Sequence, residues 1–471
     1  MKINTHSNLH EVRSLFEAQL PEQLKQGLRV AGCTQKKWRV SIPGSKSVTN
    51  RATVLAMLSG KPLKVEAPLL ADDTWWGFLA LNQLGFELDL HEMPHSIGIR
   101  PPSSARKKSP NDAQSVLVHV GQAGTLGRFL PAALLNWQKV YPDSNLHSFV
   151  VTADEQLARR PLSPLISALR QLGGSFEVAE GKAFPLSVSV STLHGHCRVD
   201  SSTSGQFLSG VLLAAGGSRN QCQISRSEKL VQPDYVRMTL QMLADFGARV
   251  DVDPRFEKFT VHGGEWNPPS SYRVEADAST ACYYAALACV LGIDIEVENL
   301  GSGTVQPDFE FISFLRQFGF DAEVQHHAFR VMGSRGRVKS TSALKLDLSR
   351  CSDQALTVGV MGIVTGVTVE VHGVAHIRHH ESDRIGSFCS NCRSLGIEVD
   401  ELPDGFRVRS SVSANGLTGD WPTHNDHRFA LSGIVLSAWA SKVRVLNPGC
   451  MQKTAPAFVA QLQSLGVLFG S

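Results

Sequence analysis

Residues 172–178 of this chain run Leu-Gly-Gly-Ser-Phe-Glu-Val, and this stretch decides the fold because its pattern recurs along the sequence. A helix-like run ends in an apolar residue and a glycine, and a strand-like alternation follows. Glycine is the expected stop of a helix, since it adopts a positive φ without steric cost. The hydrophobic period then changes from about 3.6 to about 2, as a passage from helix to strand requires.

The same pattern occurs six times, at Gly85, Gly173, Gly247, Gly319, Gly396 and Gly466. Successive glycines are 88, 74, 72, 77 and 70 residues apart. Such even spacing predicts six α+β units; the alternative is the chance recurrence of a common helix end. Two groups of three units would form two similar lobes, joined near the Gly/Pro-rich stretches at residues 43–44 and 263–273.

The bulk composition excludes several classes of protein. The chain has 471 residues, 42% of them hydrophobic and 19% charged, with a formal net charge of +3. This length predicts two or more domains, and the composition is that of a globular protein. The near-neutral charge gives no support to a nucleic-acid or membrane partner. Nine cysteines without framework spacing, and no apolar signal segment in residues 1–30, predict a soluble cytoplasmic protein.

Two groups of side chains have the chemistry of metal ligands, but neither group is complete. Cys389 and Cys392 form the only close cysteine pair, and a zinc site needs a second pair. Four histidines lie near one another without a distant set of ligands: His372, His376, His379 and His380. We therefore expect packed thiols, an ion-pair network and no bound metal.

The clearest anion-binding motif is Pro-Gly-Ser-Lys-Ser-Val-Thr-Asn-Arg at residues 43–51. A strand-like stretch precedes it and a helix-like run follows, so Lys46 and Ser47 reach a helix start, where unpaired backbone N–H groups favour anions. Arg51 lies one turn further along the same helix face. A nucleotide-binding P-loop is disfavoured because Ser45 separates the glycine from the lysine.

Further motifs could hold anions, although each also has a purely structural explanation. Gly121–Arg128 is a glycine-rich turn, Arg159-Arg160-Pro161 opens a helix, and Ser201–Gln206 precedes one. Small residues permit close approach of a ligand, and arginine can bind carboxylate or phosphate. The structural alternatives are a turn, a solvated basic pair and a helix cap. In the C-terminal half, charged motifs occur at residues 378–384, 425–428 and 453–454.

In their order, these motifs resemble the 5-enolpyruvylshikimate-3-phosphate synthase family of enolpyruvyl transferases. The resemblance runs from Arg39 to Gly466 and is most specific in Pro-Gly-Ser-Lys-Ser-x-x-Asn-Arg, Glu-Ser-Asp-Arg and Asn-Asp-His-Arg. It implies an α/β fold, a two-lobed inside-out α/β barrel, with three βαβαββ repeats in each lobe. The first lobe would span residues 46–275, and the second residues 36–45 with 276–471. Residues 1–35 would be an N-terminal extension of unknown role.

The resemblance also implies an activity. The protein would transfer the enolpyruvyl group of phosphoenolpyruvate to the 5-hydroxyl of shikimate 3-phosphate, releasing phosphate, in the shikimate pathway to chorismate and the aromatic amino acids. It would act as a monomer without metal or organic cofactor. Two anionic substrates repel each other, so such a reaction needs several fixed cations in a water-poor site.

Residue roles carry over where this chain matches the family. Four residues would be catalytic: Lys46, Asp353, Glu381 and His427. Asp353 would accept the proton of the acceptor hydroxyl, and Glu381 would protonate the methylene carbon. Phosphoenolpyruvate would be bound by Lys46, Gly124, Arg160, Gln206, Arg384, Arg428 and Lys453. The acceptor would be bound by Ser47, Arg51, Ser204, Gln206, Tyr235, Asp353 and His380.

The chain departs from the family pattern mainly on the acceptor side. Gly205 stands where many members have a second serine, and Gln232 where a phosphate-binding serine is common. Other differences are Gln122, Phe129, His376 and His380. A transferase with another acceptor and a catalytically silent relative are therefore the alternatives. The related transferase that acts on UDP-N-acetylglucosamine typically uses a loop cysteine. It is disfavoured because no cysteine occurs between Gln114 and Arg160 in this chain.

Overall fold

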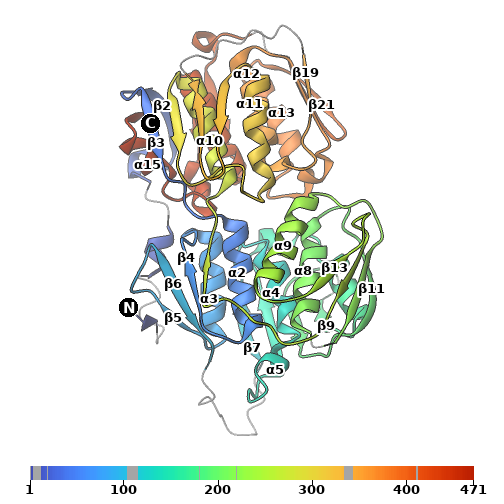
Figure 1. Ribbon diagram of the computed structural model, residues 1–471. Helices are drawn as coiled ribbons and strands as arrows, with labels where there is room; N and C mark the ends of the chain where they lie inside the picture. The colour runs from blue at the N-terminus through green and yellow to red at the C-terminus, as the bar shows by residue number, and fades with distance from the viewer. Residues whose placement is uncertain are drawn as a thin grey trace. The chain divides into compact units, whose positions relative to one another are not determined.

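Six sheets with the same pattern of parallel and antiparallel pairing make up the β structure of the described residues in a computed structural model (Figure 1). The structure describes residues 2–3, 12–17, 20–102, 115–179, 181–218, 220–333, 343–409 and 412–470. The chain divides into two units. Unit 1 consists of Met1–Leu15 and Gly44–Val274, and unit 2 of Phe16–Pro43 and Glu275–Ser471.

In every sheet a parallel pair of strands is followed by two antiparallel strands. In unit 1, the first sheet has the spatial order β15 (Ser271–Arg273), β4 (Leu63–Glu66), β6 (Ser96–Arg100), β5 (Glu87–Asp89), with β1 (Lys2–Ile3) beyond β5. The second sheet has the order β7 (Val116–His119), β8 (Ser148–Thr152), β10 (Leu186–Ser189), β9 (Ser175–Val178). The third has the order β11 (Gly195–Val199), β12 (Cys222–Arg226), β14 (Lys258–Val261), β13 (Val250–Val252). In unit 2, the fourth sheet has the spatial order β3 (Lys37–Val40), β16 (Asp294–Val297), β18 (Phe329–Met332), β17 (Asp321–Val324). The fifth sheet has the order β19 (Leu344–Asp347), β20 (Val369–His372), β22 (Gly405–Arg409), β21 (Glu398–Leu402). The sixth has the order β23 (Gly419–Pro422), β24 (Val443–Leu446), β2 (Gly27–Cys33), β25 (Val467–Gly470).

Each of the six recurring glycines precedes the equivalent strand of its sheet, the last of the four strands that all six sheets share. Their φ angles are 96°, 98°, 89°, 90°, 73° and 82° from Gly85 to Gly466. At the first of them, Gly85 N–H donates to Asn82 O and Phe86 N–H donates to Leu81 O, both at 2.9 Å. This is the Schellman arrangement that ends a helix with a left-handed residue. The repeat predicted from the sequence is therefore confirmed.

The helices lie between the sheets within each unit. Unit 1 has α2 (Lys46–Ser59), α3 (Asp72–Gln83), α4 (Leu126–Leu134), α5 (Trp137–Val140), α6 (Glu155–Ala158), α7 (Ser163–Gln171), α8 (Gly205–Gly217) and α9 (Pro233–Asp245). Unit 2 has α10 (Ala278–Leu291), α11 (Phe311–Gln317), α12 (Ala355–Thr365), α13 (Arg384–Ser394), α14 (His427–Trp439) and α15 (Phe458–Ser464). Short 3-10 helices are η2 (Ser14–Phe16), η3 (Glu22–Leu24), η4 (Pro307–Glu310), η6 (Ser352–Gln354), η7 (Ala375–His379), η8 (Ala414–Gly416) and η9 (Pro448–Lys453).

Three helices form the centre of each unit and are buried on nearly all sides. In unit 1 these are α2, α4 and α8, which pack against one another, and in unit 2 they are α10, α12 and α14. A helix that is apolar all round is stable only where it is enclosed. The sheets enclose these helices (Figure 1).

Strand β2 completes the sixth sheet with residues from the start of the chain. It pairs antiparallel with both β24 and β25, and Leu28 and Val30 are at most 1% exposed. The third strand of this sheet therefore comes from residues 27–33, which had no readable role in the sequence. Among the described residues, none of the helices is long and apolar enough to cross a membrane.

Candidate active site

Helix α2 begins at Lys46, as the first motif predicts. Nζ of Lys46 lies 3.4 Å from Oδ2 of Asp73, the second residue of α3, whose side chain is 1% exposed. Oδ1 of Asp73 has no hydrogen-bond partner among the described residues. A buried carboxylate therefore holds the ammonium group at the start of a helix, where the helix dipole also favours a bound anion.

Arg51 is enclosed within unit 1. Its guanidinium donates hydrogen bonds to Thr239 Oγ1 at 2.8 Å and to the carbonyls of Ser47 and Tyr235, each at 3.0 Å. It also lies 5.0 Å from the ring centroid of Phe129. Burial lowers the pKa of Arg51 to about 10. These contacts tie α2 to α9, so Arg51 has a structural role whatever it binds.

The Gly121–Arg128 loop brings two arginines together at Gly124. Arg128 Nη1 donates to the Gly124 carbonyl at 2.7 Å. A Cβ built on Gly124 would lie 2.8 Å from Arg160 Nη1 and 3.1 Å from Arg128 Nη1. Arg160 comes from the turn between α6 and α7. Only glycine allows this approach of two guanidinium groups to the backbone, so the loop and Arg160 form one cationic site.

Two of the polar residues assigned to the acceptor, Ser204 and Gln206, lie at the start of α8. Ser204 caps the helix, and its Oγ accepts the N–H of Gln206 at 3.3 Å. Gln206 Oε1 and the hydroxyl of the buried Ser201 lack hydrogen-bond partners in the part of the chain that is described. Buried polar atoms without partners are uncommon, so these two atoms are candidates for ligand contacts.

The two main departures from the family pattern are neighbours in space. A Cβ built on Gly205 would lie 2.7 Å from the Val231 carbonyl and 3.4 Å from the Gln232 carbonyl. Gln232 itself has a φ of 51°, in the left-handed region. The turn before α9 therefore fills the space that a side chain at position 205 would need. Tyr235 lies in the first turn of α9.

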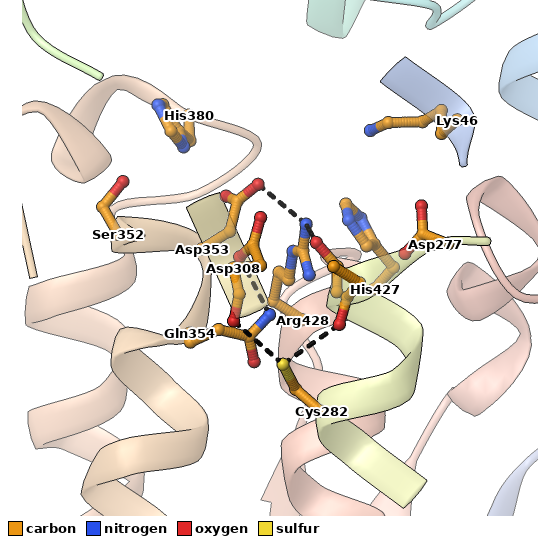
Figure 2. A network of polar contacts seen from close by, with 12 residues as sticks. Lys46, Asp277, Cys282, Asp308, Ser352, Asp353, Gln354, His380, His427 and Arg428 are labelled. Carbon is orange, nitrogen blue, oxygen red and sulfur yellow. Dashed lines mark hydrogen bonds and ion pairs between the residues drawn. The ribbon is translucent and has the colours of Figure 1, made fainter. Parts of the chain in front are cut away.

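In unit 2, Asp353 lies between two arginines. Its Oδ1 accepts Arg384 Nη1 at 2.8 Å. Its Oδ2 accepts Arg428 Nη2 at 2.7 Å (Figure 2). Asp353 belongs to η6, Arg384 is the first residue of α13, and Arg428 is the second of α14. Three segments far apart in the sequence thus meet at one carboxylate.

Arg384 is 2% exposed and contacts three carboxylates. Besides Asp353, it binds Glu381 Oε2 at 2.9 Å and Asp426 through two hydrogen bonds. Burial acts to lower the pKa of Arg384, but the carboxylates of Asp426, Glu381 and Asp353 together raise it well above the usual value. Lys453 Nζ binds the other oxygen of Glu381 at 2.9 Å.

Arg428 extends this network into the core of unit 2. It donates to Tyr283 Oη at 3.2 Å and to Ser279 Oγ at 3.3 Å. Its Nε is buried without a hydrogen-bond partner among the described residues. Beneath it, Gln354 Nε2 donates to Asp308 Oδ1 at 3.1 Å, and the Cys282 thiol contacts the Asp308 carbonyl at 3.2 Å (Figure 2). The unused N–H makes Arg428 suited to an anionic ligand.

Three histidines surround the network. His376 Nε2 lies 2.8 Å from Ser352 Oγ, and burial lowers the pKa of His376 to about 4. His380 Nδ1 is 3.1 Å from Arg384 Nη1; because arginine only donates, this nitrogen is the acceptor of a neutral ring. His427, at the start of α14, is 2% exposed, and its Nδ1 lies 3.6 Å from Asp426 Oδ1.

The structure thus groups the residues singled out in the sequence into two sets, one in each unit. Unit 1 brings Gly124 and Arg160 together, and it places Lys46, Ser204 and Gln206 at helix starts. Unit 2 brings together His380, Asp353, Glu381, Arg384, Arg428 and Lys453. The described residues contain no group of three or more His, Cys, Asp or Glu that could hold a metal ion.

Sequence reasoning missed the carboxylates that orient the cations. Asp73 holds Lys46, and Asp426 holds Arg384 and accepts the Arg428 backbone N–H at 2.9 Å. Asp426 lies within the Asn-Asp-His-Arg motif, so its position was a usable signal. Asp73 gave only a weak signal, as one of two acidic residues at a helix start.

The chain thus combines repeated sheets around buried helices with guanidinium and ammonium groups that carboxylates hold at helix starts, an arrangement suited to binding anions. A family model described as EPSP synthase (3-phosphoshikimate 1-carboxyvinyltransferase) matches residues 31–462. The chain belongs to this family.

Relatives and solved structures agree with this assignment. The chain is 32% identical over 440 residues to 3-phosphoshikimate 1-carboxyvinyltransferase 2 of Halalkalibacterium halodurans, and the matched region covers 91% of this chain and 92% of that protein. It is 31% identical over 431 residues to 3-phosphoshikimate 1-carboxyvinyltransferase of Syntrophobacter fumaroxidans, with 91% and 97% covered. The structure matches EPSP synthase from Acinetobacter baumannii with a TM-score of 0.75 at 21% identity, over 94% of this chain and 99% of that one. The predicted two-lobed inside-out α/β barrel is therefore confirmed.

Proposed function

We propose that this protein transfers the enolpyruvyl group of phosphoenolpyruvate to the 5-hydroxyl of shikimate 3-phosphate and releases phosphate. The family match over residues 31–462 supports this reaction. The observation that carries it is the arrangement at Arg384, which binds both Asp353 and Glu381. Two carboxylates on one guanidinium provide a base and an acid in one site.

Asp353 and Glu381 divide the proton transfers in this proposal. Asp353 accepts the proton of the acceptor hydroxyl while the hydroxyl oxygen forms a bond to C2 of phosphoenolpyruvate. Glu381, which enters in its protonated form, delivers a proton to C3, which gives a tetrahedral adduct. In the elimination, Glu381 takes a proton back from C3 while the bond between C2 and the phosphate oxygen breaks, and the departing phosphate takes the proton held by Asp353. His427, buried next to Asp426, assists at the tetrahedral centre.

The cations neutralise the charge of the substrates. We assign Arg384 and Arg428 to the carboxylate of phosphoenolpyruvate, and the unused Nε of Arg428 supports this role. Lys46, Arg160 and Lys453 are assigned to its phosphate. Cations that are already held in place stabilise developing charge without reorganisation at the moment of reaction. Carboxylates of the protein itself fix four of these side chains, namely Lys46, Arg384, Arg428 and Lys453.

Acceptor binding is assigned to Ser47, Arg51, Ser204, Gln206, Tyr235, Asp353 and His380. A different acceptor alcohol is the second candidate, because the Val231 carbonyl fills the space beside Gly205. A monomeric state and a cytoplasmic location also stay predictions.

The reaction is tested by phosphate release from phosphoenolpyruvate in the presence of shikimate 3-phosphate. We expect turnover in the wild type and a loss of about 10²–10⁴-fold in Asp353→Asn and Glu381→Gln, the range for acid–base groups. Glu398→Gln is the matched control, since Glu398 is exposed and pairs with Arg409. Turnover with another alcohol but not with shikimate 3-phosphate would establish the second candidate instead.

A further inference from the structure

An indole ring lies directly against Gly121, the first residue of the Gly121–Arg128 loop. A Cβ built on Gly121 would be 2.2 Å from Cε2 and 2.3 Å from Nε1 of Trp76. Gly121 has a φ of 52°, and its carbonyl accepts the Asp154 N–H at 3.0 Å. Trp76 therefore occupies the space of a side chain at position 121 and limits where the loop can begin.

Trp76 is itself held by residues around it. Its Nε1 donates to Asp72 Oδ2 at 3.3 Å, and the ring of His119 meets it edge-on at 5.0 Å between centroids. Arg13 contacts both Asp72 and Trp76. Its Nη2 donates to Asp72 Oδ1 at 3.0 Å, and its guanidinium carbon lies 5.0 Å from the indole centroid. Arg13 thus supports Trp76 directly and through Asp72.

The start of the loop is connected to Arg160 by a short path. Gly124 follows Gly121 by three residues, and the Ala123 N–H donates to the Val120 carbonyl at 3.0 Å, which closes a tight turn. Arg160 Nη1 would touch any Cβ at Gly124. A shift of Gly121 must therefore move the backbone against which Arg160 lies.

We propose that Arg13 is a positioning residue for the phosphate-binding part of the active site. It holds Trp76 against Gly121 and so keeps the loop where Arg160 can bind phosphate. The inference rests on the proposed function in that Arg160 contacts the phosphate of phosphoenolpyruvate. It gives Arg13, in a segment that the sequence left without a role, a part in substrate binding.

Steady-state kinetics of Arg13→Ala, Arg13→Lys and Lys25→Ala test this proposal. Lys25 is the control because it lies in the same N-terminal region, exposed and paired with Glu22. For Arg13→Ala we expect the KM for phosphoenolpyruvate to rise about three- to tenfold, the amount set by one cation–π contact and one ion pair. The kcat and the KM for shikimate 3-phosphate should stay within about twofold, because the loop positions donor binding alone.

Two further readouts separate positioning from a merely structural contact. Hydrogen exchange of the amides at residues 121–124 should be faster in Arg13→Ala than in the wild type or Lys25→Ala. Arg13→Lys should restore part of the affinity, since it keeps the cation over the indole but not the planar guanidinium. Calorimetric titration with inorganic phosphate should show the same order of affinities.

Unchanged KM and unchanged exchange in Arg13→Ala would overturn the inference. So would a fall in kcat with both KM values unaltered, or an equal rise in both. If the wild type failed to turn over shikimate 3-phosphate, the proposed function would fall, but the exchange and phosphate-binding measurements would still decide the role of Arg13.

Discussion

Arg384 and Asp426 share two hydrogen bonds, from Nε to Oδ2 at 2.8 Å and from Nη2 to Oδ1 at 3.2 Å, with both side chains at most 2% exposed. The same carboxylate caps α14 by accepting the Arg428 N–H at 2.9 Å. One buried acid therefore orients the Arg384 guanidinium and fixes the helix start that carries Arg428, and these are the two arginines assigned to the substrate carboxylate. A ligand finds them already placed, which lowers the cost of binding.

Removal of this acid should destabilise unit 2. In Asp426→Ala, the Arg384 charge stays buried without its main partner, so we expect the free energy of unfolding to fall by about 3–5 kcal/mol. Asp426→Asn should lose less, because the amide oxygen still accepts a hydrogen bond. Urea unfolding measures both changes. Asp420→Ala is the control: this residue forms an exposed pair with Arg444, and its loss should cost no more than about 1 kcal/mol. Equal losses in the two alanine variants would contradict the assignment.

Gly124→Ala should weaken binding of phosphoenolpyruvate. The new Cβ would lie 2.8 Å from Arg160 Nη1, so the guanidinium must move by several tenths of an ångström. This displacement of Arg160 affects binding of the donor and leaves the acid–base groups Asp353 and Glu381 in place. We therefore expect the KM for phosphoenolpyruvate to rise by about tenfold and kcat to change little. Steady-state kinetics with Gly470→Ala alongside provide the comparison, since a Cβ at Gly470 meets nothing within 4 Å. A normal KM in Gly124→Ala would show that Arg160 does not bind the donor.

His376 should make stability depend on pH. Burial lowers its pKa from 6.5 to about 4, with smaller effects of Asp353, which raises it, and of Arg384 and His379, which lower it. Between these two pH values the unfolded chain binds a proton that the folded protein does not. The stabilising effect of a neutral His376 is thus complete above pH 6.5 and is lost as the pH falls towards 4. The loss should reach up to about 3 kcal/mol.

The measurement compares urea unfolding of the wild type and His376→Asn at pH 7 and at pH 4.5. The asparagine amide can still hydrogen-bond to Ser352 but does not titrate. We expect the wild type to lose more stability than the variant on acidification. Parallel losses in the two proteins would rule out His376 as the titrating group.

The sequence was most informative where a local rule acts. A helix that ends at a glycine such as Gly85 needs a left-handed residue there, so all six repeats were visible without a structure. Lys46 likewise sits at the predicted start of α2. These features depend on neighbours in the chain, which is why periodicity and turn chemistry identify them.

Pairings between distant segments were not predictable in the same way. Asp73 reaches Lys46 from another helix, and β2 completes a sheet whose other strands all lie near the C-terminus. Nothing in residues 27–33 indicates which strands they join, since any amphipathic strand could fill that position. The contact between Trp76 and Gly121 is of the same kind, because only packing reveals it.

Gly205 and Gln232 should behave as a coupled pair. A Cβ at position 205 would meet the Val231 carbonyl at 2.7 Å, which is backbone and cannot rotate away. Gly205→Ser should therefore destabilise the protein by about 1–3 kcal/mol, as overpacking does. Gln232 holds a left-handed conformation that glycine adopts without strain, so Gln232→Gly should let the turn move and recover part of this loss in the double variant.

Urea unfolding of the two single variants and the double variant gives the coupling, which we expect to be at least about 0.5 kcal/mol. Ala67→Gly is the matched control in this cycle, because Ala67 also has a left-handed φ of 49° but precedes α3 instead of α9. Combined with Gly205→Ser it should be additive. Additivity in both cycles would mean that positions 205 and 232 are not energetically coupled. The turn at Val231 would then not account for the glycine at the start of α8.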